Sequence, residues 1–198
     1  MSLESPDGRR PRVLDDAAAM RAFAHPVRLA LHEILLREGP ATAADAARQA
    51  GISQALASYH LRQLAKYGFV EQAEARDERE RPWKVTEPVQ VWSEADAPDV
   101  TAARGLLEQV IAERAMTRLL EWQQRRREEP EAWRGAGSIG NVHLYATPEE
   151  LQELGNAMSA LLEPLMARVF DPARRPAGSR PVLLSQILVP LPPSGSGG

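Results

Sequence analysis

Residues 53–66 hold the side chains best suited to chemistry, and that chemistry is hydrogen bonding and charge pairing with a polyanion. Hydroxyl and amide groups share the stretch with two cations, and no acidic residue interrupts it. Hydroxyls and amides can read the edges of DNA bases, while cations neutralise phosphate. The outward-facing polar residues at helical spacing are Ser53, Gln54, Ser58, Tyr59, Arg62 and Lys66. The stretch therefore predicts a helix that contacts DNA.

The residues of this helix also predict where it begins and ends. Ser53 can cap a helix N-terminus, and Gly68 suits the left-handed conformation just past a C-terminus. Leu56, Leu61 and Leu64 recur at helical spacing and are expected to face a core. We therefore expect a short amphipathic helix with an apolar inner face.

Further helices are predicted before this one. They are expected at residues 15–24, 26–37 and 42–50. Asp15 or Asp16 can cap the first, Pro26 fits the first turn of the second, and Thr42 can cap the third. Gly51 supplies the turn into residues 53–66, so the third and fourth helices form a helix-turn-helix.

A hairpin is predicted after Gly68, with strands at 69–74 and 83–86 and a charged tip between them. Beside a DNA-binding helix, such a hairpin can carry arginines to phosphate or the minor groove. The candidate arginines are Arg76, Arg79 and Arg81. Asp77, Glu78 and Glu80 alternate with them, so a solvated loop without DNA contacts is an equally open interpretation.

Residues 17–87 resemble the winged helix-turn-helix of ArsR-type bacterial transcriptional regulators. The resemblance is carried by the segment FAHPVRLALHEILLREGPATAADAARQAGISQALASYHLRQLAKYGFVE, with its Pro-x-Arg start to the second helix and its serine-x-His-Leu-x-x-Leu recognition segment. It implies a homodimer, often a repressor that a metal or small molecule releases from DNA. With the pattern above, it predicts DNA contacts from Thr42, Ser53, Gln54, Ser58, Tyr59, His60, Arg62, Lys66, Arg76, Arg79 and Arg81.

A long helix is predicted from residue 100 to about 127, with a broad apolar stripe that one helix cannot bury alone. In the family, a dimerisation helix follows the DNA-binding unit, so the stripe is interpreted as a subunit interface. The interface candidates are Leu106, Leu107, Val110, Ile111, Leu119 and Trp122. An intramolecular core helix is the alternative.

The last third departs from a minimal ArsR-type regulator. Residues 139–146 and 182–189 have strand patterns, and Thr147 with Pro148 starts an amphipathic helix between them. The prediction is a strand-helix-strand unit for effector binding or dimerisation, whose strands pair either within one subunit or across the dimer. Candidate ligand contacts are Trp122, His143, Tyr145, Met158 and Met166, although each taken singly is more often core.

Metal sensing and catalysis find little support in the sequence. The chain has no cysteine, and its four histidines are scattered, none of them in the long helix. The paired histidine and carboxylate sites of zinc-sensing relatives therefore cannot be laid on that helix. Phosphate loops and nucleophile motifs are also missing from the sequence, so neither an enzyme nor a resident cofactor is expected.

Composition and pattern together predict a mainly helical protein with a small β content. The expected parts are a disordered tail (1–13), a winged helix-turn-helix domain (14–95), a long dimerisation helix (98–129), a C-terminal unit (138–190) and a flexible tail (191–198). Residues 88–98 are expected to form a short connector between the wing and the long helix. A net charge of −3 argues against indiscriminate binding to nucleic acid, so any DNA contact must come from a local cationic surface. We expect a cytoplasmic, homodimeric DNA-binding regulator with a possible small-molecule effector. A protein-interaction module without specific DNA binding is the alternative.

Overall fold

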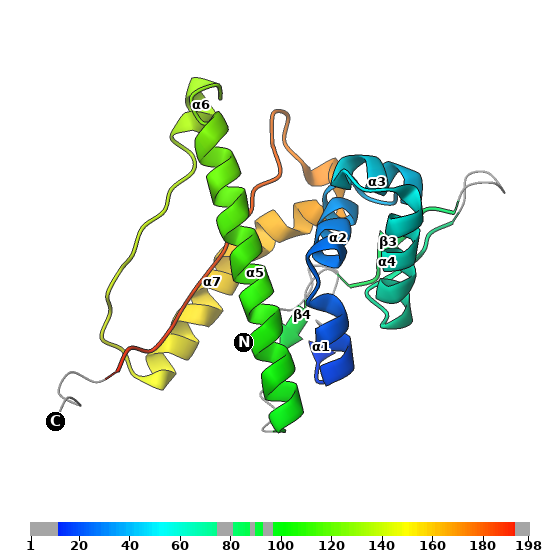
Figure 1. Cartoon of the computed structure of the whole chain (residues 1–198). Coiled ribbons are helices and arrows are strands. Elements are labelled where there is room, and N and C mark those ends of the chain that lie inside the picture. Colours follow the sequence, from blue (N-terminus) through cyan, green and yellow to red (C-terminus); the bar gives the residue numbers. More distant parts are fainter. Residues whose placement is uncertain (1–11, 75–80, 88–89, 93–96, 193–198) are drawn as a thin grey trace.

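The computed structural model of the chain describes residues 12–74, 81–87, 90–92 and 97–192, and it is mainly helical (Figure 1). The first half contains α1 (Ala17–Phe23), α2 (Pro26–Glu38), α3 (Ala43–Ala50) and α4 (Gln54–Lys66). The β content is small: β2 (Val70–Gln72) pairs antiparallel with β3 (Trp83–Val85), and β1 (Arg12–Leu14) pairs with β4 (Gln90–Trp92). The second half contains α5 (Pro98–Arg125), α6 (Glu131–Arg134), α7 (Pro148–Phe170) and a short 3-10 turn, Pro172–Arg174. The predicted fold class is confirmed.

Local capping sets the starts of the N-terminal helices as the sequence predicted. The Asp16 carboxylate accepts hydrogen bonds from the amides of Ala18 and Ala19, at 2.9 and 3.2 Å. The Thr42 hydroxyl accepts from the Asp45 amide at 3.1 Å, and the Ser53 hydroxyl accepts from the Leu56 amide at 3.2 Å. Each side chain satisfies an amide that has no partner inside its helix.

The glycines on either side of α4 adopt the left-handed conformation that ends one element and redirects the chain. Gly51 has φ +66° and closes α3, while Gly68 has φ +70° and follows α4. Other residue types are strained at such angles. Both turns therefore fix the direction of α4 relative to α3 and to the hairpin.

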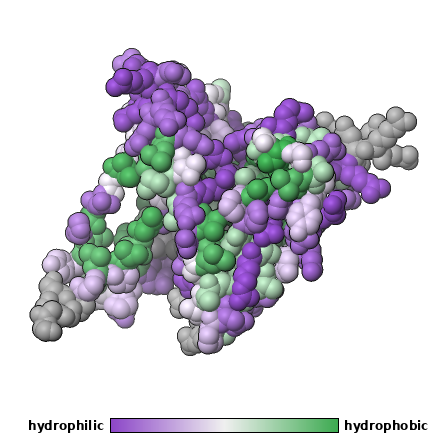
Figure 2. All heavy atoms as spheres, viewed as in Figure 1, coloured by the Kyte–Doolittle hydropathy of each residue, from purple (hydrophilic) through white to green (hydrophobic). Residues whose placement is uncertain are grey.

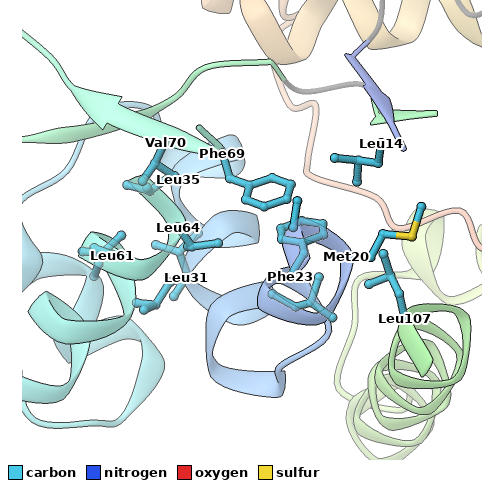
Figure 3. Packing of buried hydrophobic residues seen from close by; sticks show 14 of the residues in the cluster. Leu14, Met20, Phe23, Leu31, Leu35, Leu61, Leu64, Phe69, Val70 and Leu107 are labelled. Carbon is cyan, nitrogen blue, oxygen red and sulfur yellow. The ribbon is translucent and has the colours of Figure 1, made fainter. Parts of the chain in front are cut away.

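One buried cluster joins α1, α2, α4, the start of β2 and α5 (Figure 3). Phe23 stacks on Phe69 with ring centroids 4.4 Å apart, and the edge of His32 meets Phe23 at 5.0 Å. Met20 in α1 and Leu107 in α5 are buried in the same cluster. Because the rings and aliphatic chains are excluded from water together, α4 is packed into the same unit as α5.

A set of charged side chains connects α2 to α5 on the outside of this core. The Glu33 carboxylate accepts from Arg114 Nε at 2.7 Å and also pairs with the Arg114 Nη2 group. Arg118 Nη2 lies 3.2 Å from the other Glu33 oxygen. These contacts place α5 alongside the helix-turn-helix rather than on a flexible linker.

Two sequence predictions at the ends of the DNA-binding domain need correction. Residues 12 and 13 were expected in a disordered tail and residues 88–98 in a connector, but Arg12–Leu14 pairs in parallel with Gln90–Trp92. The Leu14 side chain is buried in the core. Pairing between segments so distant in sequence leaves no local signal, so pattern analysis missed it. Residues 1–11 lie outside the described residues.

The predicted C-terminal strands are also wrong for a single subunit. Residues 139–146 and 182–189 belong to no strand, and their side chains are exposed. A strand needs a hydrogen-bonded neighbour, and neither segment has one here. The helix between them is confirmed, since Thr147 and Glu150 form a reciprocal capping box at the start of α7. Of the predicted flexible tail, only Leu191 and Pro192 are among the described residues.

The C-terminal third is attached to the rest of the chain by few contacts. Within it, Arg180 reaches back to Glu129 at 2.6 Å and stacks over the Trp133 ring at 4.9 Å, while α7 touches α2 in the first half of the chain. Figure 1 shows the chain before and after α7 as open connections beside that helix. In the described part of the chain, no helix combines the length and the apolar character needed to cross a membrane.

Candidate nucleic-acid interface

The outer face of α4 is uncovered and polar. Ser53 and Gln54 lie at its N-terminal end, Tyr59 is 50% exposed near the middle, and Arg62 and Lys66 are exposed toward the C-terminal end. Among the described residues no carboxylate pairs with Arg62 or Lys66, and Lys66 Nζ lies 5.5 Å from the centre of the Tyr67 ring. Ser58 is half-buried at the edge of this face. This surface can donate hydrogen bonds and attract phosphate without a competing acid.

Two acids of the helix-turn-helix and its hairpin, Glu71 and Asp45, are already paired. Glu71 in β2 lies 3.1 Å from Lys84 Nζ in β3. Asp45 in α3 has its pKa lowered by a hydrogen bond from the Thr42 hydroxyl and by Arg48. The Thr42 hydroxyl therefore serves the start of α3, where it also donates to Asp45 Oδ2 at 2.7 Å. Thr42 was predicted among the DNA contacts, and its hydroxyl is occupied in this cap.

Two predictions about the faces of α4 are wrong. Leu56, expected in the core, is 40% exposed, and His60, expected at the DNA, is only 5% exposed. The inner face is formed by Ala57, His60, Leu61 and Leu64, which follow the helical repeat with a different phase. Leu56 instead joins the outer face, where an apolar side chain can contact a thymine methyl group.

His60 forms a small cluster with groups at the start of α2. Its ring lies 4.6 Å from His25 and meets the edge of Tyr59 at 5.1 Å, between centroids. Burial, and then the neighbouring His25 and Arg28, lower the pKa of His60, while burial and Arg28 lower that of His25. Both shifts favour the neutral imidazole, and the ring of His60 contacts Tyr59 beneath the outer face.

The predicted wing is present as the β2–β3 hairpin. An isolated bridge between Ala41 and Trp83 extends β3 toward the start of α3. The Thr86 hydroxyl donates to the Gly68 carbonyl at 2.6 Å and ties the end of the hairpin to the end of α4. Arg81 is exposed in the loop just before β3, while Arg76 and Arg79 lie outside the described residues.

The apolar stripe of α5 is buried on one side of the helix and exposed on another. Leu107 is buried against α1 and Val110 packs on the same core, as the intramolecular alternative predicted. Leu106 and Ile111 remain exposed, together with Met116 and Leu120, which the sequence analysis did not select. Leu119 is half-buried. Met116 and Leu120 lie four residues apart and form an apolar ridge of their own, on the side of α5 away from Leu107.

The structure does not bring the candidate ligand contacts together. Trp122 lies in α5, with Arg126 4.8 Å above its ring and Gly137 packed against it. His143 is exposed and Tyr145 is 99% exposed in the irregular segment before α7, and Met158 and Met166 are half-buried in α7. The described residues contain no group of three or more His, Asp or Glu side chains placed to hold a metal ion.

Comparison with known proteins supports the helix-turn-helix. Residues 23–73 match a family model described as a helix-turn-helix domain, which covers α2 to β2. No curated protein matches the chain. A solved structure of a ZitR variant from Lactococcus lactis is similar over 73% of this chain and 73% of its own, at 21% identity and a TM-score of 0.29, values too low to support any argument. The chain thus carries a helix-turn-helix domain, the unit through which regulators of transcription bind DNA.

Proposed function

We propose that the protein is a homodimeric transcriptional regulator, acting as a repressor, that places α4 of each copy in the major groove of a pseudo-palindromic operator. The observation that carries the proposal is the uncovered, acid-free outer face of α4. This face lies on a helix with a capped start and a buried inner side. A rigid helix with such a face is the form in which helix-turn-helix proteins present side chains to base edges.

The side chains of this face divide into two roles. Gln54 lies in the first turn of α4, where a recognition helix meets base edges, and its amide can make a paired contact with adenine. Arg62 and Lys66 lie farther along the helix and carry the charges that phosphate attracts. Tyr59 lies between Gln54 and Arg62 along the helix, and Ser58 lies at the edge of the face. Discrimination between bases would come from the first-turn contact of Gln54, and most of the affinity from the cations Arg62 and Lys66.

A dimer would provide more phosphate contacts than one copy can make. The chain has a net charge of −3, and the outer face of α4 carries only two cations. Two copies double the phosphate contacts and require two half-sites about 34–36 Å apart. Exposed apolar residues on α5, including Leu106 and Ile111, support association. An effector that controls this dimer is part of the proposal, with the C-terminal third as the place where it acts.

The division of roles is tested by titrating operator variants with two single mutants. Gln54→Ala is expected to flatten the preference among operator variants by about 1–3 kcal/mol, while Lys66→Ala weakens binding to every sequence and reduces the salt dependence by about one ion. Gln123→Ala, an exposed glutamine on α5, serves as the control and should bind like the wild type. Equal losses on every sequence for both mutants would contradict the assignment.

A second candidate function is a protein-interaction module without specific DNA binding, favoured by the acidic balance of the chain. Footprinting separates the two. Sharp protection over two half-sites about one helical turn apart supports the regulator. Diffuse protection that vanishes in moderate salt supports the interaction module, and a reporter gene placed behind the protected site then distinguishes repression from activation.

A further inference from the structure

The chain exposes far more surface than a compact protein of its mass. Its accessible surface is 13971 Å², whereas a compact monomer of 21.8 kDa exposes about 9,300 Å². That total is for the whole chain, and an obligate dimer buries about 2,000–5,000 Å² over both partners.

Much of the exposed apolar surface lies in the C-terminal third. Figure 2 shows hydrophobic side chains exposed over α7 and the segments beside it. On α7, Leu161 and Leu165 are exposed, and Ala167 is the buried residue of that helix among those described. Residues 182–191 form the longest exposed apolar run, with Ile187 at 76%. Contiguous apolar surface of this kind marks an interaction site.

The sequence of residues 182–189 is symmetric in polarity. Val182, Leu183 and Leu184 precede the polar pair Ser185 and Gln186, and Ile187, Leu188 and Val189 follow it. If two copies of the segment pair antiparallel with Ser185 or Gln186 at the centre, the apolar half of each copy lies along the apolar half of the other. Pro181 and Pro190 then fall at the strand ends, where a missing N–H group is tolerated.

We propose that residues 182–189 of two copies of this chain pair as antiparallel strands across a two-fold axis at Ser185 or Gln186, covering the exposed faces of α7. The inference rests on the dimer of the proposed function and names the segment that makes it. It also explains why a segment with a strand pattern on both faces forms no strand in one subunit, because its hydrogen-bonding neighbour is the same segment of the other copy.

A second copy fits this surface better than a different partner. The segment carries no charge from Val182 to Leu191, and exposed strands of separate proteins are usually protected by charges, bulges or proline against pairing with each other. A two-fold interface requires one surface that complements itself, which the symmetric polarity of 182–189 provides. A different partner would require no such symmetry.

Cysteine cross-linking tests the pairing directly. Because the chain has no cysteine, a single introduced cysteine can form a disulfide only between copies. Residues opposite each other in antiparallel strands have Cα atoms about 4.5–5.5 Å apart, within disulfide range. We expect Ser185→Cys or Gln186→Cys to give covalent dimers under mild oxidation, and Gln49→Cys, on the exposed side of α3, to stay monomeric on a denaturing gel. Absence of cross-linking at both central positions would overturn the proposal.

The oligomeric state of charge variants provides the second measurement. By light scattering the wild type should be a dimer at micromolar concentration, and Ile187→Glu should raise its dissociation constant roughly a hundredfold or more, because it buries two unpaired charges. Ser179→Glu adds the same charge just before the segment and should leave the dimer intact. Circular dichroism confirms that each variant keeps its helices.

The possible outcomes separate this inference from the proposed function. A wild type that is dimeric while Ile187→Glu remains dimeric and Ile111→Glu dissociates would assign the interface to α5 alone and overturn the inference without affecting DNA binding. A monomeric wild type, with the apolar surface taken up by a ligand or another protein, would overturn it as well. A dimer that cross-links at 185 or 186 but binds no operator would support the inference and contradict the regulator.

Discussion

Two parts of the chain share the same apolar sequence patterns but differ in whether those apolar residues are buried. They are the helix-turn-helix unit (residues 12–74 with the first half of α5) and the C-terminal third (residues 126–192). In the first, apolar residues at helical spacing are buried by neighbours in the same chain, as Leu31, Leu61 and Leu64 show. In the second, equally regular apolar residues, such as Leu161 and Ile187, face solvent. The two parts differ because an apolar face needs a second surface to exclude water, and only the first part has such a surface within the same chain.

This contrast teaches that stability is concentrated in one part of the subunit. The buried cluster ends with Val100, Ala103 and Leu107 in the first turns of α5. Beyond it, α7 touches α2, while the Arg180–Glu129 pair joins residues within the C-terminal third itself. Local unfolding should therefore begin in the C-terminal third unless another copy covers it.

The largest expected effect comes from truncating a leucine in each part. Leu64→Ala, in the fully buried inner face of α4, should lower the free energy of unfolding by about 2–5 kcal/mol at any protein concentration. Leu165→Ala, exposed on α7 in one subunit, should cost less than about 1 kcal/mol in dilute protein and more where copies associate. Urea denaturation at two protein concentrations measures both. A Leu165→Ala cost as large as that of Leu64→Ala in dilute protein would erase the distinction between the two parts.

The second expected effect is a loss of stability in mild acid, confined to the helix-turn-helix unit. Burial lowers the pKa of His32 from 6.5 to about 4. The unfolded chain therefore takes up a proton first as the pH falls below 6.5, and stability on the order of 3 kcal/mol is lost between that pH and about 4. His25 and His60, whose pKa values are also lowered by burial, shift stability in the same direction.

A substitution at His32 separates the contribution of this residue to the pH dependence of stability from that of the other titrating groups. His32→Leu keeps an apolar side chain beside Phe23 and removes the titrating group, so its stability should change much less between pH 7 and pH 4.5 than that of the wild type. His143→Gln removes an exposed histidine from the C-terminal third and should retain the wild-type pH profile. Thermal melts across this pH range measure both. An unchanged slope in His32→Leu would contradict the assignment.

The smallest expected effect compares two glycines that differ in backbone conformation. Gly51 has φ +66°, so Gly51→Ala should destabilise the protein by about 1 kcal/mol. Gly105 is helical within α5, and an added Cβ there would meet no atom within 4 Å. Gly105→Ala should therefore stabilise α5 by about 0.5–1 kcal/mol. Opposite signs in chemical denaturation are the expected result, and equal signs would show that the turn at Gly51 tolerates a side chain.

Sequence reasoning succeeded wherever the determining contacts are local. The caps at Asp16, Thr42, Ser53 and Thr147 depend on hydrogen bonds within three residues, and all four helices begin as predicted. The left-handed Gly51 follows from the same short range. Such features carry their cause in a few neighbouring side chains.

Sequence reasoning failed where the cause is distant. The inner face of α4 is chosen by packing against α3 and α2, and less against α1, which buries His60 and exposes Leu56 against the hydrophobic pattern. The pairing of Arg12 with Gln90 depends on the whole fold between them. The segments 139–146 and 182–189 carry strand patterns without a neighbour in the subunit, so the pattern alone could not say where they pair.

The Phe69–Phe23 stack has a mechanical consequence for DNA reading. Phe69 follows α4 by three residues and stacks on the last residue of α1, and α1 packs directly on α5. Phe69 in the turn after α4, Phe23 and Met20 in α1 and Leu107 in α5 belong to one buried cluster, which ties the end of α4 to α5. In a dimer, the angle at which the two copies meet would therefore set the distance between the two α4 helices. The spacing between the two half-sites of the operator would then depend directly on that angle.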